Sequence, residues 1–149
     1  MTMKRTNLLQ TLPDAYKAMS ALESYVNSTE LEPIHKELIK LRASQINGCA
    51  YCLDMHSRDA RKLGETEQRI YTLRAWRDTP FFDEKEQAIL ALTEEVTLIS
   101  KAGVTDDTYN KAVEVLGDKY VNEVIMAAIT INAWNRIAIS THLQPALQK

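Results

Sequence analysis

The 149-residue chain has few of the residues that interrupt helices, with only four glycines and four prolines. Sheets joined by tight turns need more of both, so this scarcity argues against a β fold. Long apolar runs are also missing, since no stretch approaches the roughly 20 residues of a membrane span. The basic start of the chain leads into only a short apolar run, which does not predict a signal peptide. We therefore expect a cytoplasmic protein that does not insert into a membrane.

A strong charge of one sign is absent as well. Eighteen lysines and arginines stand against 20 aspartates and glutamates, and no dense basic run is available to follow a phosphate backbone. We expect no nucleic-acid partner. The 45% of hydrophobic residues is enough to fill the core of one domain over residues 1–149 without stabilising cross-links. The only two cysteines are therefore not needed to hold the fold together.

Apolar spacing and helix-ending residues predict an all-α bundle of six to seven helices. Asp83 followed by Glu86 resembles a capping box at the start of one of them. The glycines fall where helices are expected to end. In chain order, the expected helices cover residues 14–26, 33–47, 49–64, 65–77, 83–103, 105–117 and 118–139.

The last of these helices is apolar on nearly every side between Val121 and Ile139. A helix of this kind must be covered all round by neighbouring helices or by another subunit. We therefore expect a homo-oligomer. The alternative is a central core helix within a monomer.

The two cysteines form a Cys-x-x-Cys unit, with Tyr51 just before Cys52 and His56 four residues after it. Such a unit can close a disulfide, bind a metal, or react as a thiolate beside a second thiol. If a helix starts at Cys49, then Cys49, Cys52 and His56 share one helical face. Unpaired backbone N–H groups in the first turn favour a negative sulfur, so both thiols should ionise more easily. His56 is placed to accept or relay a proton.

Glu37 lies at the edge of the apolar stripe of the preceding helix, where a carboxylate is costly unless it has a partner or a task. The two helices meet directly at Asn47 and Gly48, so a short antiparallel hairpin would bring Glu37 against the cysteine turn. The simpler interpretation pairs Glu37 with Lys40 or Arg42 at the surface. Structural zinc prefers a second close ligand pair, which this chain lacks, and we expect no metal and no cofactor.

These residues resemble the motif of the alkylhydroperoxidase D-like (AhpD-like) proteins of the carboxymuconolactone decarboxylase superfamily. The motif is carried by Glu37, Cys49, Cys52 and His56 within EPIHKELIKLRASQINGCAYCLDMHSRDARKLG. The resemblance extends through AWRDTPFFDEKEQAILALTEEVTLIS and INAWNRIAIS, and so covers about residues 15–142. It implies an AhpD-like helical bundle that assembles into trimers or hexamers and reduces organic hydroperoxides.

The resemblance also implies a role for each site residue. Cys52 is the peroxidatic cysteine, Cys49 is the resolving thiol that condenses with it to a disulfide, and Glu37 and His56 relay protons. An external dithiol, on a lipoyl protein or a thioredoxin-like protein, would reopen the disulfide. Tyr51 occupies a position where the best-studied members have a histidine. We regard it as an accessory residue, because a phenol donates a hydrogen bond but is a poor base at neutral pH.

Three functions are consistent with the sequence. The first is an antioxidant peroxidase of this kind, an oxidoreductase with a redox-active disulfide. The second is a thiol-disulfide oxidoreductase or redox sensor with little peroxidase activity. The third is an oligomeric metal-binding or scaffold protein without catalysis. The cysteine pair argues against decarboxylation, because the decarboxylase branch of the superfamily lacks it.

Overall fold

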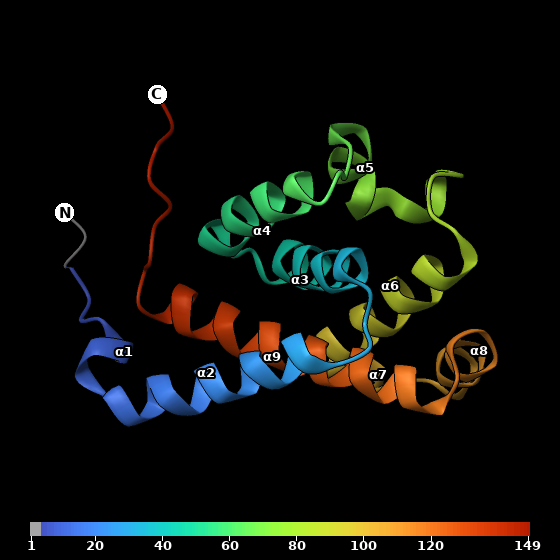
Figure 1. The fold of residues 1–149 in the computed structure, drawn as a ribbon, viewed down its shortest axis with the longest axis horizontal. Helices are drawn as coiled ribbons and strands as arrows, with labels where there is room; N and C mark the ends of the chain where they lie inside the picture. The colour runs from blue at the N-terminus through green and yellow to red at the C-terminus, as the bar shows by residue number, and fades with distance from the viewer. Residues whose placement is uncertain (1–3) are drawn as a thin grey trace.

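The computed structural model describes residues 4–149, and this part of the chain consists of helices and connecting segments with no strand (Figure 1). The all-α prediction is confirmed. A 3₁₀ helix, η1, covers Leu73–Asp78. The α-helices are α1 (Leu8–Thr11), α2 (Pro13–Ser28), α3 (Pro33–Asn47), α4 (Ala50–Lys62), α5 (Glu67–Thr72), α6 (Glu84–Thr97), α7 (Ile99–Ala102), α8 (Asp106–Leu116) and α9 (Asp118–Ser140).

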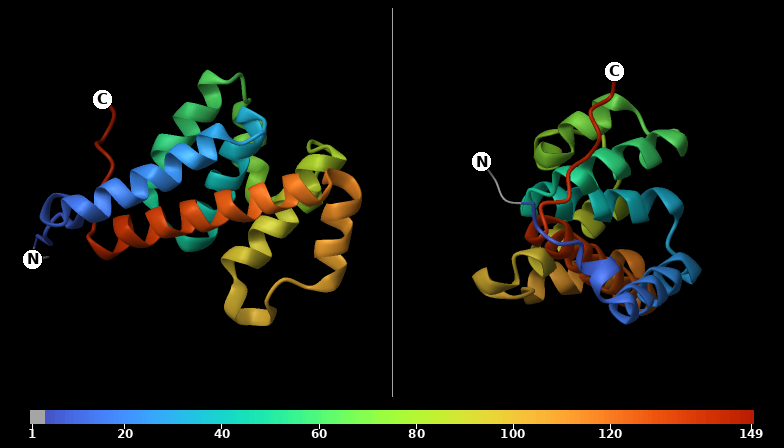
Figure 2. Two further views of the ribbon diagram at one scale, coloured as in Figure 1. Left: turned by 60° about the horizontal axis from the view of Figure 1, so that its bottom comes forward. Right: turned by 90° about the vertical axis from the view of Figure 1, so that its left-hand side faces the viewer.

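The longest helix, α9, is the element on which the others assemble. It contacts α2, α3, α4, α6 and α8, and Figure 2 shows α2 running beside it in the opposite direction. Helices α3 and α4 form an antiparallel hairpin that packs on α9 through α3. Among the described residues, no helix combines the length and the apolar character that crossing a membrane requires.

Most helix ends follow the sequence signals. The capping box at Asp83 and Glu86 is present in full. Gly48 ends α3 in the left-handed conformation, with φ of 73°, which a residue with a side chain adopts only with strain. Cys49 is the N-cap of α4, so the helix itself begins one residue later than expected. The sequence did not predict the short α1, whose N-terminus is capped by the side chain of Asn7.

Two predicted helices are interrupted. The expected helix over residues 65–77 is divided into α5 and η1, with a non-helical backbone at Ala75. Packing explains this bend. The bent backbone lets Leu73 be buried and lets the indole N–H of Trp76 reach Glu94. The expected helix over residues 83–103 is divided into α6 and α7 at Leu98.

The apolar residues of α9 are not all buried within the chain. One side of the helix, including Val121, Val124 and Ile131, lies in the main hydrophobic core. Elsewhere on the helix, Ile129 and Ile139 remain 44% and 40% exposed. Within the described residues, α9 is therefore not covered on all sides by its own chain, although it is the central helix that the monomeric alternative predicted. The oligomer remains a prediction, and these exposed isoleucines are candidates for its interface.

Glu94, near the end of α6, connects three elements through charge-assisted hydrogen bonds. Its carboxylate accepts from Arg42 Nε at 3.0 Å, from Trp76 Nε1 at 2.7 Å and from Arg77 Nη1 at 2.6 Å. Burial on its own raises the pKa of Glu94, but the hydrogen bonds from Arg77, Trp76 and Arg42 outweigh it and hold the pKa below its ordinary value. The ionised carboxylate therefore stabilises the packing of α3, η1 and α6.

We expect Glu94→Gln to lower the free energy of unfolding by about 2 kcal/mol near neutral pH, because the largely buried donors of Arg42 and Trp76 lose a charged acceptor. The pKa of Glu94 is depressed in the folded state, so its contribution is complete above the ordinary value of 4.5. That contribution is lost as the pH falls through the folded-state pKa. Urea unfolding of both proteins at about pH 7 and about pH 3 measures this difference. A difference of the same size at both pH values would contradict the prediction.

Candidate functional site

The two cysteines form a disulfide at the start of α4. They are 1% and 2% exposed, so both sulfurs are buried. The backbone N–H of Cys52 donates a hydrogen bond to Cys49 Sγ at 3.3 Å. When the disulfide opens, this donor and the other free N–H groups of the first turn favour a negative charge on Cys49.

Glu37 and His56 meet across the α3–α4 hairpin, as the sequence predicted. Glu37 Oε2 lies 3.0 Å from His56 Nδ1, and each residue is only 8% exposed. With the imidazole neutral, Nδ1 donates to the carboxylate and leaves Nε2 as an acceptor. Because His56 is one helical turn beyond Cys52, this pair lies beside the disulfide and forms a buried proton-accepting unit.

A cavity of about 610 Å³ brings these groups together. Cys52 lines it and Cys49 does not, so Cys52 is the sulfur that a ligand in the cavity meets first. Tyr51 also lines the cavity and packs against the cysteine pair. The remaining wall is polar at one end and apolar elsewhere. The polar residues include Glu23, Glu37, Lys40, His56 and Asp59, and the apolar ones include Leu9, Tyr16, Met55, Trp134, Ile137 and Leu143.

A larger hollow of about 1020 Å³ lies between the two terminal segments, with Arg5 and His142 among its lining residues. It contains neither cysteine and neither member of the Glu37–His56 pair. We therefore assign the site to the smaller cavity, where the reactive groups are found.

The surface interpretation of Glu37 is wrong in part. Lys40 does pair with Glu37, with Nζ 3.8 Å from Oε1, but both side chains are buried in the cavity wall. Arg42 pairs with Glu94 instead. The sequence analysis missed Glu23 on α2, which accepts hydrogen bonds from Lys40 Nζ and from Trp134 Nε1, each at 3.0 Å.

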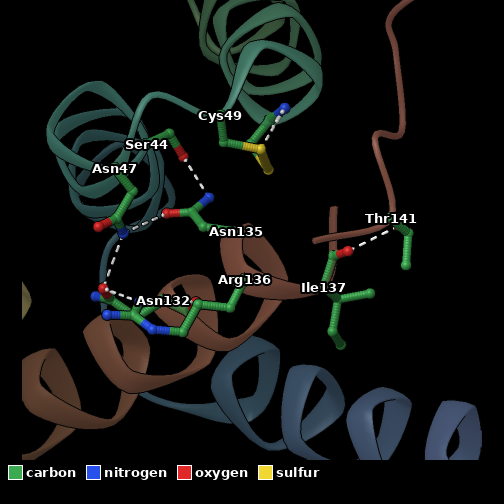
Figure 3. Close-up of a disulfide and its surroundings, with 9 residues drawn as sticks. Ser44, Asn47, Cys49, Asn132, Asn135, Arg136, Ile137 and Thr141 are labelled. Carbon is green, nitrogen blue, oxygen red and sulfur yellow. Dashed lines mark hydrogen bonds between the residues drawn. A yellow bond between two sulfur atoms is a disulfide. The ribbon is translucent and has the colours of Figure 1, made fainter. Parts of the chain in front are cut away.

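A network of amides, with the buried Asn135 at its centre, holds the cysteine turn in place (Figure 3). Asn47, the last residue of α3, donates from Nδ2 to the side-chain oxygens of Asn132 and Asn135 on α9, both at 2.9 Å. Asn135 is fully buried and donates to Ser44 Oγ at 3.0 Å. The end of α3 is thereby attached to α9 directly before Gly48 and Cys49. Buried hydrogen bonds of this kind fix one geometry, because leaving a partner unpaired is costly.

Glu37, His56 and Asp59 are the described residues whose ligand atoms come close enough to hold a metal ion, all within 4.8 Å of one another. This set contains neither cysteine of the Cys-x-x-Cys unit, because the two cysteines are bonded to each other. The ammonium of Lys40, 3.8 Å from Glu37 Oε1, repels a cation at this position. The donor set therefore does not favour a metal.

Comparison with known proteins connects this geometry to a family. Residues 13–95 match the model of the carboxymuconolactone decarboxylase family. The uncharacterized protein YdfG of Bacillus subtilis (strain 168) is 41% identical over 137 residues, which span 92% of this chain and 93% of that protein.

Solved structures agree with the sequence comparisons. ATU0492 from Agrobacterium tumefaciens, a protein of unknown function to which a role in antioxidant defence as AhpD has been ascribed, superimposes with a TM-score of 0.94 and 40% identity. That match covers 98% of this chain and 100% of the other. The alkylhydroperoxidase AhpD core of a peroxidase-related protein from Ralstonia eutropha JMP134 shares the fold, with a TM-score of 0.81, 18% identity, and coverage of 93% and 74%. The chain therefore belongs to the carboxymuconolactone decarboxylase family, as an AhpD-like member.

Proposed function

We propose that this protein is a thiol-dependent peroxidase that reduces organic hydroperoxides. The observation that carries the proposal is the position of Cys52. Its sulfur lines an apolar cavity, has a second cysteine bonded to it, and lies one helical turn from the buried Glu37–His56 pair. Nucleophile, resolving thiol and proton acceptor are the three parts that reduction of a peroxide by thiols requires.

In the first step, Cys52 of the reduced protein gives its thiol proton to His56 Nε2, and the thiolate attacks the distal oxygen of the hydroperoxide. The sulfur–oxygen bond forms as the oxygen–oxygen bond breaks, so sulfur is oxidised to sulfenic acid. The alkoxide that leaves takes the proton from His56 and departs as an alcohol. Glu37 stabilises the imidazolium between the two transfers.

In the second step, the Cys49 thiol attacks the Cys52 sulfenic acid, which forms the disulfide and releases water. An external dithiol must then reopen the disulfide. A thiolate entering the cavity meets Cys52 Sγ and displaces Cys49, whose leaving sulfur receives the Cys52 N–H. The second thiol of the reductant attacks the mixed disulfide and releases Cys52, so two electrons pass to the protein in each cycle. A lipoyl group or a thioredoxin-like protein supplies such a dithiol.

The cavity walls favour a hydroperoxide with an apolar body. The apolar part of such a substrate is buried against the apolar side chains of the wall, a contact that hydrogen peroxide is too small and too polar to make. These side chains are Met55, Trp134, Ile137 and Leu143. Tyr51, on the same wall, is available as an accessory hydrogen-bond donor to the bound peroxide. The exposed isoleucines of α9 support assembly into a homo-oligomer, for which a trimer or a hexamer is proposed.

The second candidate is a thiol-disulfide oxidoreductase or redox sensor. It is favoured by Tyr51, which stands at a position where a peroxidase of this kind benefits from a histidine. In that function the cysteine pair, with Cys49 as the N-cap of α4, would exchange with the disulfides of partner proteins and react poorly with peroxide.

A single-turnover experiment separates the two candidates. We expect the reduced protein, mixed with cumene hydroperoxide in excess, to consume about one equivalent of peroxide and to lose both thiols as the disulfide forms. Addition of a dithiol should then support repeated turnover. Free-thiol titration and peroxide assay measure both quantities. Thiols that survive the hydroperoxide but exchange readily with a disulfide would overturn the peroxidase and support the second candidate.

A further inference from the structure

Lys40 is a buried cation in the wall of the cavity. It lies one helical turn after Glu37 on α3, and only 8% of the residue is exposed. Lysine is almost never buried to this extent unless its charge is paired. Its ammonium has two carboxylate neighbours, Glu23 Oε1 at 3.0 Å and Glu37 Oε1 at 3.8 Å. The first contact is a hydrogen bond, and the second is an ion pair without one.

Glu23 is itself held in place. While its Oε1 receives Lys40, its Oε2 accepts the indole N–H of Trp134 on α9 at 3.0 Å. Glu23, held by α2 and α9, therefore fixes the ammonium of Lys40 on the side opposite to His56 and α4. Glu23, Lys40 and Glu37 thus form a row of side chains whose charges alternate, with the ammonium between the two carboxylates.

The row continues to the cysteine helix through the second oxygen of Glu37. Its Oε1 faces Lys40 and its Oε2 accepts from His56 Nδ1 at 3.0 Å. The cation on one oxygen thus leaves the other oxygen to the histidine. Without Lys40, the carboxylates of Glu23 and Glu37 would share the polar end of the cavity with no cation between them, and would repel each other.

We propose that Lys40 is a positioning residue for the proton relay, one that holds the Glu37 carboxylate turned toward His56. The inference rests on the proposed function, since it assigns Lys40 to the same relay. Lys40 acts through Glu37 and not on the substrate. Its removal should therefore slow every reaction in which the Glu37–His56 pair takes a proton from Cys52.

Alkylation of the reduced protein by iodoacetamide tests this step without any peroxide. The rate for Cys52 at about pH 7, located by peptide mass, reports how readily the thiol gives up its proton. We expect Lys40→Met to slow alkylation by about tenfold and Lys40→Arg to recover most of the rate, because the cation is restored. The kcat for cumene hydroperoxide should fall by a similar factor, with KM within about twofold of wild type.

Lys36→Met is the matched control. Lys36 is on the same helix and also connects α3 to α2, through a hydrogen bond from Nζ to the Asn27 carbonyl at 3.1 Å, but its ammonium does not pair with Glu37. A loss of packing between α2 and α3 would affect both variants. We expect Lys36→Met to alkylate at the wild-type rate, and equal slowing of the two variants would overturn the proposal.

A double variant decides whether Lys40 acts through Glu37. In a Glu37→Gln background, adding Lys40→Met should change the alkylation rate by less than about twofold, since the relay is already lost. A further tenfold loss in that background, or an unchanged rate in Lys40→Met alone, would overturn the assignment. If wild type alkylates as expected but does not consume hydroperoxide, the peroxidase function fails while the role of Lys40 stands.

Discussion

Replacing Cys52 by serine is expected to abolish hydroperoxide reduction, leaving less than about a thousandth of the wild-type rate. A serine hydroxyl does not ionise near neutral pH, and the remaining sulfur, Cys49, does not line the cavity. The variant should fold normally, because the core is large without the disulfide and a hydroxyl replaces a sulfur of similar shape. Stopped-flow measurement of cumene hydroperoxide consumption by the reduced protein checks the rate.

The matched control is Cys49→Ser, which keeps the nucleophile and removes only the resolving thiol. It should consume about one equivalent of hydroperoxide and then stop with sulfenic acid on Cys52, which dimedone labels and mass spectrometry locates. Sulfenic acid on Cys49 in the Cys52→Ser variant would reverse the two roles. The comparison is needed because the two sulfurs have different advantages. The N-cap hydrogen bond favours a thiolate on Cys49, whereas Cys52 is the sulfur that lines the cavity.

The second large effect is expected for Glu37→Gln, which should lower kcat by about a hundredfold while the protein keeps its fold. Glutamine has nearly the same shape and its amide oxygen still accepts from His56 Nδ1. It does not carry the negative charge that stabilises the imidazolium formed during proton transfer. Steady-state kinetics with a dithiol reductant gives kcat, and circular dichroism reports the fold.

Glu32→Gln is the comparison for this variant. Glu32 is the N-cap residue of the same helix, but its side chain is 62% exposed. We expect its kcat to stay within about twofold of wild type. A Glu37→Gln enzyme that retains full turnover would show that His56 works without the carboxylate, and would remove Glu37 from the mechanism.

The parts of the site that the sequence predicted are those that depend on neighbours in the chain. Gly48 and the adjoining Cys49 mark the end of one helix and the start of the next. A direct connection between two helices then brings Glu37 to His56, only 19 positions away. Helix-ending signals and short connections are local, and local patterns are readable without knowledge of the tertiary structure.

The parts that could not be predicted depend on distant contacts. Glu23 meets Trp134 across 111 positions, and nothing in the sequence around either residue marks that contact. The bend at Ala75 likewise results from the packing of Leu73 and from the hydrogen bond of Trp76 to Glu94, not from a glycine or proline. In such places tertiary packing overrides local preference.

Both ends of the chain contribute to the cavity, Leu9 from α1 and Leu143 from the segment after α9. Helix α1 and the segment that follows α9 also lie on the same side of the molecule (Figure 1). An affinity tag fused to either end is therefore joined to a segment that itself forms part of the cavity wall, and a polyhistidine tag adds imidazoles, and any metal carried over from purification, to a protein with a reactive thiol. Kinetic constants for this protein should be measured after the tag has been cleaved, with the tagged form assayed alongside as a test for interference.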